Sequence, residues 1–162
     1  MYAICGWTGS VTDLRTPESS LDAMLPASGT PAAGGAGRIH GAEAHVASLM
    51  GGDLVHRDGD LTLCLSESVL DDRGERIDAR ALARLYRDHG DGLLGRIHGS
   101  FSLAIIEPAR RRVLLAVDRA GIRPLYCARV GDGIAFASRL GALTRLPGIT
   151  ARISDQAVFE YV

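Results

Sequence analysis

Short apolar runs alternate with glycine- and aspartate-containing turns along most of the chain, and this pattern predicts a strand-rich domain. We expect strands at residues 2–7, 45–49, 54–57, 61–65, 101–107, 112–118, 125–130 and 133–137. Turn-forming sequences at residues 58–60, 108–111 and 131–133 separate three pairs of these strands and predict hairpins. With two or three helices added, the expected fold class is α+β.

Helical periodicity is clear in one segment only. Apolar or aromatic positions recur at spacings of three and four, at Ala79, Leu82, Leu85, Tyr86 and His89, and predict the buried face of a helix. Asp78 is placed to cap its amino terminus and Gly90 to end it. Shorter helices are expected at residues 138–144, capped by Ser138, and from residue 154 onward. Residues 10–37 are rich in Ser, Pro, Gly and Ala, which predicts a long loop with one weak helical turn near residues 21–25.

The basic residues are all arginine, because the sequence contains no lysine. This excludes a Walker-type phosphate loop and Schiff-base chemistry within these 162 residues. The net charge of −1 gives no reason to expect a nucleic-acid or membrane partner. Residues 1–72 carry a net −7 and residues 73–162 a net +6. An arginine stripe contributes to this asymmetry, at Arg73, Arg76, Arg80, Arg84 and Arg87. It is interpreted either as a solvated face or as a docking surface for an acidic partner or another domain.

Cysteine and histidine spacing gives no sign of a metal site or a disulfide framework. Cys5, Cys64 and Cys127 are odd in number and widely spaced, which is typical of a reducing compartment. His40 and His45 lie five residues apart on one expected strand, which predicts opposite faces. A signal peptide and an apolar run long enough to span a bilayer are both missing from the sequence, so a cytoplasmic location is expected.

Three segments in the second half resemble one family. They are residues 95–107 (G-R-I-H-G-S-F-S-L-A-I-I-E), residues 113–126, which end in Asp118-Arg119-Ala120-Gly121-Ile122-Arg123-Pro124-Leu125-Tyr126, and residues 134–139 (I-A-F-A-S-R). They resemble the amino-terminal glutaminase domain of asparagine synthetases, a class II glutamine amidotransferase, with Arg123 where the family usually has lysine. The opening M-Y-A-I-C-G-W is similar to the family start M-C-G-I-A-G-W. The resemblance implies an Ntn-hydrolase fold of αββα layers, in which two antiparallel sheets lie between helices.

That resemblance also implies an amino-terminal cysteine nucleophile whose own α-amine acts as the base. In this chain Tyr2 stands at the nucleophile position, and a phenol with a pKa of about 10 is a poor nucleophile at neutral pH. Cys5 falls where the family has alanine, and we interpret it as a buried strand residue. We therefore expect no catalytic residue and no metal here.

The glutamine pocket that the resemblance implies is also incomplete. The family segment N-G-E-I-Y-N aligns with residues 66–71 (S-E-S-V-L-D), which lack the Asn-Gly pair of the oxyanion hole. The arginine that would hold the glutamine carboxylate has no counterpart in residues 46–49. Asp78 alone aligns with a family pocket residue, the aspartate that binds the glutamine ammonium group, and its position as a helix cap explains it equally well.

The resulting hypothesis is a degenerate glutaminase-like domain of an ATP-dependent amide ligase. We expect this domain at residues 1–153, and at residues 154–162 the start of a helix that leads into a synthetase domain. ATP and Mg²⁺ would bind in that synthetase domain. The full-length enzyme is expected to be a lasso-peptide macrolactam cyclase, a natural-product enzyme, in preference to a β-lactam synthetase. Its expected partners are its own synthetase domain, a precursor peptide and a leader-processing protein.

Two alternatives stay open. The first is an active glutamine amidotransferase that uses Cys5 after removal of residues 1–4. The second is an adaptor that binds an acidic partner through the arginine-rich helix.

Overall fold

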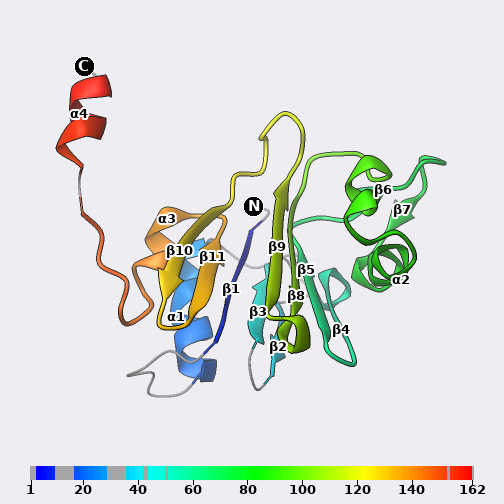
Figure 1. Cartoon of the computed structure of the whole chain (residues 1–162), viewed down its shortest axis with the longest axis horizontal. Coiled ribbons are helices and arrows are strands. Elements are labelled where there is room, and N and C mark those ends of the chain that lie inside the picture. Colours follow the sequence, from blue (N-terminus) through cyan, green and yellow to red (C-terminus); the bar gives the residue numbers. More distant parts are fainter. Residues whose placement is uncertain are drawn as a thin grey trace.

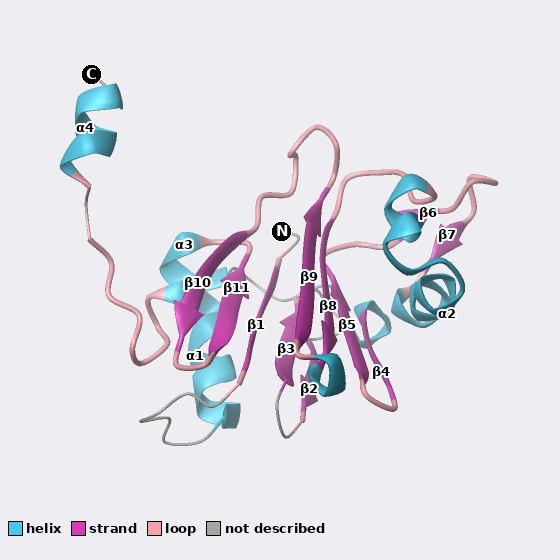
Figure 2. Cartoon of the chain, viewed as in Figure 1, coloured by secondary structure: helices cyan, strands magenta, loops and turns pink. Residues whose placement is uncertain are grey.

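The computed structural model describes residues 3–9, 17–28, 36–41, 44–49, 51–152 and 154–161. Two antiparallel sheets form its centre (Figures 1 and 2). The first sheet has the order β10-β11-β1-β3-β2 and contains β1 (Ile4–Thr8), β2 (Gly37–His40), β3 (Ala44–Ser48), β10 (Tyr126–Val130) and β11 (Gly133–Ala137). The second has the order β4-β5-β8-β9 and contains β4 (Val55–Asp58), β5 (Leu61–Leu65), β8 (Ser102–Glu107) and β9 (Arg112–Val117). A small ladder pairs β6 (Val69–Leu70) with β7 (Arg76–Ile77).

Helices cover the outer faces of both sheets. The α-helices are α1 (Pro17–Ser28), α2 (Ala79–His89), α3 (Leu140–Leu143) and α4 (Asp155–Tyr161), and short 3₁₀ segments are η1 (Gly52–Leu54), η2 (Gly90–Gly95) and η3 (Pro108–Arg110). The helices α1 and α3 pack on the first sheet and α2 packs on the second. Figure 1 shows α4 at the end of an extended connection that leads away from α3.

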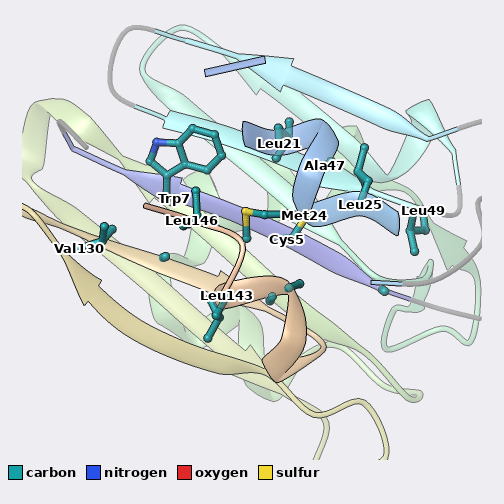
Figure 3. Packing of buried hydrophobic residues seen from close by; sticks show 14 residues of the cluster. Cys5, Trp7, Leu21, Met24, Leu25, Ala47, Leu49, Val130, Leu143 and Leu146 are labelled. Atoms are coloured by element: carbon teal, nitrogen blue, oxygen red, sulfur yellow. The ribbon is translucent and has the colours of Figure 1, made fainter. Parts of the chain in front are cut away.

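Buried apolar side chains form three clusters that follow these layers. One cluster, which includes Trp7 and Leu21, lies between α1, α3 and the first sheet (Figure 3). A second, which includes Ile4 and Phe136, lies between the two sheets. The third packs Leu82 of α2 against the second sheet. The order of layers is therefore helix, sheet, sheet, helix, and the predicted α+β class is confirmed.

The eight predicted strands and the three predicted hairpins are confirmed, with ends that differ by one or two residues. The prediction for residues 10–37 was wrong in part, because a 12-residue helix, α1, occupies residues 17–28. Leu21, Met24 and Leu25 are buried in the first cluster, so tertiary packing stabilises a segment whose own helix propensity is weak. Residues 10–16 and 29–35 of the predicted loop lie outside the described residues.

The helix α2 has the predicted ends. Asp78 Oδ1 accepts a hydrogen bond from the Ala81 N–H (2.8 Å), and Gly90, with a φ of 55°, ends the helix. The predicted buried face was wrong at its last position, because His89 is exposed and Ala83 is buried instead.

Two further local predictions are corrected. Ser138 does not cap α3, whose N-cap is Arg139, without a side-chain hydrogen bond. His40 and His45 lie on two strands, β2 and β3, and face each other as a cross-strand pair with Nδ1 atoms 3.5 Å apart. The chain turns between them, where the Gly41 N–H donates to the Ala44 carbonyl (2.9 Å). A hairpin therefore brings together two rings that a single strand would have separated.

Candidate functional site at the start of strand β1

The backbone at the start of β1 forms hydrogen bonds with neighbouring segments on both sides. The Ile4 N–H donates to Ser138 Oγ (3.0 Å), and the Ser138 N–H donates back to the Ile4 carbonyl (2.8 Å). On the other side, the Leu49 N–H donates to the Ala3 carbonyl (2.9 Å). Ala3 and Ile4 are both buried. This end of the strand is therefore part of the folded core.

Three buried serines connect the two sheets at this point. Ser66 follows β5, Ser102 begins β8 and Ser138 follows β11. The Ser102 N–H donates to Ser66 Oγ (2.9 Å), and the Ser66 N–H donates to the Ser102 carbonyl (2.9 Å). The hydroxyls of Ser102 and Ser138 lie 3.5 Å apart, across the space between the sheets. Each of these polar groups is satisfied within the core, as buried hydroxyls require.

The family motif at residues 118–126 forms a tight turn after β9. The buried Asp118 carboxylate accepts hydrogen bonds from the N–H groups of Ala120 (3.0 Å), Ile122 (3.1 Å) and Arg123 (3.0 Å). Gly121, with a φ of 64°, allows the left-handed backbone of the turn. Burial by itself would raise the pKa of Asp118, but the backbone N–H groups outweigh it and lower the pKa below its ordinary value.

Another motif residue, Arg123, connects the turn to the segment that follows β5. Arg123 Nη2 donates to Glu67 Oε2 (3.1 Å), and Arg76 Nη2 lies 3.7 Å from Glu67 Oε1. Glu67 lies in residues 66–71, where the resemblance implies an oxyanion-hole element, and two arginines contact its carboxylate. Three other motif residues are exposed: Arg119, Pro124 and Tyr126.

Cys5 is the second residue of β1, with its backbone between Ala137 and Ala47 on the neighbouring strands. Its exposed fraction is 0%, and Figure 3 shows it pointing into the same cluster as Met24. The prediction of a buried strand cysteine is confirmed. Tyr2, at the nucleophile position of the resemblance, lies outside the described residues.

The three cysteines were also compared for disulfide bonds and for the state of their thiols. None of Cys5, Cys64 and Cys127 forms a disulfide bond. Cys64 is buried and its thiol donates to the Ala47 carbonyl (3.3 Å). Burial, with a smaller contribution from Cys5, raises the pKa of Cys64, so this thiol stays protonated. Among the described residues, no group of three or more His, Cys, Asp or Glu side chains could hold a metal ion.

Asp78 is exposed at the start of α2, and its carboxylate caps the helix, as the sequence predicted. The five arginines of the stripe are also exposed. Two of them have carboxylate partners, because Arg76 lies near Glu67 (3.7 Å) and Arg87 near Asp58 Oδ2 (3.1 Å). In the described part of the chain, no helix is long and apolar enough to cross a membrane.

Comparisons with known proteins agree with the resemblance. Residues 63–145, just over half of the chain, match the family described as "Glutamine amidotransferase domain". The chain is 34% identical over 70 residues to Asparagine synthetase [glutamine-hydrolyzing] 2 of Bacillus subtilis, which covers 43% of this chain and 9% of that protein. It is 32% identical over 68 residues to Asparagine synthetase [glutamine-hydrolyzing] 2 of Arabidopsis thaliana, or 41% of this chain and 12% of that protein. A putative asparagine synthetase of Mycobacterium tuberculosis is 32% identical over 87 residues, or 52% of this chain and 13% of that protein.

The matched parts thus span about a tenth of the length of these relatives. The turn around Asp118, the strands β8 to β11 and the serines Ser66, Ser102 and Ser138 all lie within the region that the family covers. On this evidence the chain belongs to the glutamine amidotransferase domain family.

Proposed function

We propose that this chain is a glutamine amidotransferase domain that no longer hydrolyses glutamine and that serves an ATP-dependent amide ligase as a structural and docking domain. The observation that carries the proposal is the position of Cys5. A class II amidotransferase nucleophile needs a free thiol and a free α-amine on the same residue. Cys5 is the second residue of β1 and has an exposed fraction of 0%.

Processing that made Cys5 the first residue would damage the core. Removal of residues 1–4 deletes Ala3 and Ile4, which are both buried. It also removes the carbonyl that accepts from Leu49 and the N–H that donates to Ser138. Buried groups that lose their partners destabilise a fold. The alternative of an active Cys5 therefore requires a less stable domain.

The segment that would form the glutamine pocket supports the same proposal. Ser66 is buried and bonded to Ser102, and the Glu67 carboxylate binds Arg123. Asp78 accepts from the first turn of α2. These groups have partners within the domain, so binding of a free glutamine would have to compete with existing hydrogen bonds.

The whole protein is proposed to be a macrolactam-forming cyclase of lasso peptides. In such a reaction ATP adenylates a carboxylate of the substrate and releases pyrophosphate. The substrate's own amine then forms the amide bond and releases AMP. Ammonia is not consumed, so the glutaminase chemistry can be lost without loss of the ligase reaction. The support is the combination of the family match with Tyr2 at the nucleophile position.

Glutaminase activity is tested on the 162-residue chain by ammonia release from L-glutamine, with intact mass to identify the first residue. We expect a Met1 or Tyr2 start and no ammonia above the buffer rate. A Cys5 start, with ammonia release that Cys5→Ala abolishes, would contradict the proposal.

A glutamine-analogue electrophile gives an independent measurement on the same chain. Cys127 is exposed and can react with any electrophile, so labelling is carried out on a Cys127→Ala background. We expect no glutamine-protectable label on Cys5, because a buried thiol in a strand is not accessible to the reagent.

The ligase reaction is tested on the full-length protein, starting from the DNA downstream of codon 162. An in-frame S-G-G-x-D-S-coding domain is expected. With ATP, Mg²⁺ and the precursor peptide, the mass of the product should be lower than that of the linear peptide by one water molecule. The yield of this product should not depend on glutamine or ammonium. A requirement for either nitrogen source would contradict the proposed cyclase function.

A further inference from the structure

A cavity of about 410 Å³ lies between α2 and the edge strand β4, and two arginines of α2 lie beside it. It is lined by His56, Arg57, Asp58, Arg80 and Arg84. The volume lies in the range of small-ligand sites, which are roughly 300–1,000 Å³. The cavity contains no residue of β1 or of the motif turn, so it is independent of the amidotransferase site.

The one carboxylate in this lining already has a partner outside it. Asp58 Oδ2 lies 3.1 Å from Arg87 Nη2, and the Asp58 carbonyl accepts from the same guanidinium (2.9 Å). Arg57 Nε donates to the Gly59 carbonyl (3.4 Å), a neutral acceptor. Arg80 and Arg84 make no ion pair or hydrogen bond with any of the described residues. The Arg57 guanidinium lies next to Gly41, which follows β2, on the face of β4 turned away from α2. The cavity therefore holds the guanidiniums of Arg80 and Arg84, which have no ion-pair partner among the described residues.

Helix energetics disfavour this placement of charge. Arg80 lies in the first turn of α2, where the helix dipole favours acids, and the acid at this end of the helix is the capping Asp78. Arg84 follows at i+4, and like charges at this spacing repel each other. The pair concentrates positive charge beside the cavity. A binding role explains this placement, because an anion in the cavity would relieve the repulsion between the two arginines.

We propose that this cavity binds a compact polyanion with at least two phosphate groups, of which pyrophosphate is the simplest. A guanidinium fork matches the oxygens of a phosphate group and donates to them in pairs. Two guanidiniums beside one small cavity favour a ligand with a high density of negative charge. Adjacent phosphate groups supply it in fewer atoms than an equal number of carboxylates. The proposal goes beyond the amidotransferase family assignment and does not depend on it.

Calorimetric titration of the 162-residue chain with pyrophosphate, at low ionic strength, tests the proposal. We expect saturable binding with one site per chain. The double variant Arg80→Gln/Arg84→Gln should weaken binding by about tenfold or more, since each lost guanidinium removes charge-assisted hydrogen bonds. The control, Arg145→Gln/Arg152→Gln, makes the same change in net charge at exposed arginines beyond α3 and should leave the affinity within about twofold.

Urea unfolding without ligand distinguishes a loss of binding from a loss of folding in the variant. The Arg80→Gln/Arg84→Gln variant should be as stable as the parent or more stable, because the repulsion in α2 is removed. A folded variant that has lost pyrophosphate binding supports the site.

Several results would overturn the proposal. They are the absence of saturable binding, an equal loss of affinity in the control variant, and citrate binding as tightly as pyrophosphate. Binding of an acidic peptide at Arg80 and Arg84, with none of pyrophosphate, would instead favour an adaptor for acidic partners.

Discussion

Replacement of Tyr86 by phenylalanine tests the hydrogen bond that joins α2 to the second sheet. The buried Tyr86 hydroxyl donates to Glu107 Oε2 (2.8 Å) at the end of β8 and accepts from Arg112 Nη1 (3.1 Å). The Glu107 carboxylate is also buried, and its Oε1 accepts from Arg110 Nη1 (3.1 Å). Burial, with the hydrogen bond to Glu107, raises the pKa of Tyr86 to about 12, so the hydroxyl is a donor at neutral pH.

The expected loss follows from this geometry. Phenylalanine fills the same space, so the Tyr86→Phe change removes the two hydrogen bonds of the hydroxyl, to Glu107 and from Arg112, without making a cavity. A hydrogen bond to a charged group contributes about 1.5–3 kcal/mol. Glu107 keeps its bond to Arg110, so we expect the lower half of that range, about 2 kcal/mol. With a urea m-value of roughly 2 kcal/mol/M, the unfolding midpoint should fall by about 1 M.

Urea unfolding followed by tryptophan fluorescence measures this loss. Trp7 is the single tryptophan and lies in the cluster under α1, while Tyr86 lies in the cluster under α2. The signal therefore reports unfolding at a distance from the substitution. Tyr126→Phe is the matched control, because Tyr126 is 43% exposed and should change stability by less than about 0.5 kcal/mol. Equal midpoints for the two variants would refute the assigned role of the Tyr86 hydroxyl.

Three further predictions use the same unfolding measurement. Between pH 10 and about 12 the parent should lose stability faster than Tyr86→Phe, because unfolded Tyr86 releases its proton first. Burial, and to a smaller extent the proximity of His40, lowers the pKa of His45 below 6.5 in the folded state. As the pH drops below 6.5, His45 therefore takes up a proton in the unfolded state first, and the free energy of unfolding falls. The His45→Asn variant should show a weaker dependence of stability on pH in this range. A Cβ at Gly133 would lie 1.9 Å from the Thr8 carbonyl oxygen, so Gly133→Ala should destabilise by about 1–3 kcal/mol, and unchanged stability would contradict this close packing.

Local signals were sufficient for most of the fold. The strands β5 and β8 are mostly apolar, and α2 has both a capping aspartate and a terminating glycine, which are short-range features of the sequence. The helix α1 escaped prediction because its stability comes from burial of Leu21, Met24 and Leu25 against the first sheet. A composition of Pro, Ser and Ala does not reveal that surface.

The site depends on long-range pairing, which the sequence does not reveal. His40 and His45 meet because the chain turns between them, and the apolar pattern of residues 37–48 could not place that turn. Ser66, Ser102 and Ser138 are each separated by 36 residues along the chain, yet they meet where the two sheets approach each other. A serine at a strand end is also a common turn residue, so nothing in its local context predicts a buried hydroxyl.

The motif that identifies the family performs structural work in this chain, which separates family membership from activity. The Asp118 carboxylate closes its own turn through three backbone N–H groups, and Arg123 ties that turn to Glu67. Neither contact requires a nucleophile. The family match begins at residue 63 and so does not include β1, which carries Cys5 in the core and follows Tyr2. A domain can therefore match the family over its whole matched region while the chemistry at its amino terminus is absent. That chemistry is tested by the identity of the amino-terminal residue, by ammonia release and by labelling of Cys5.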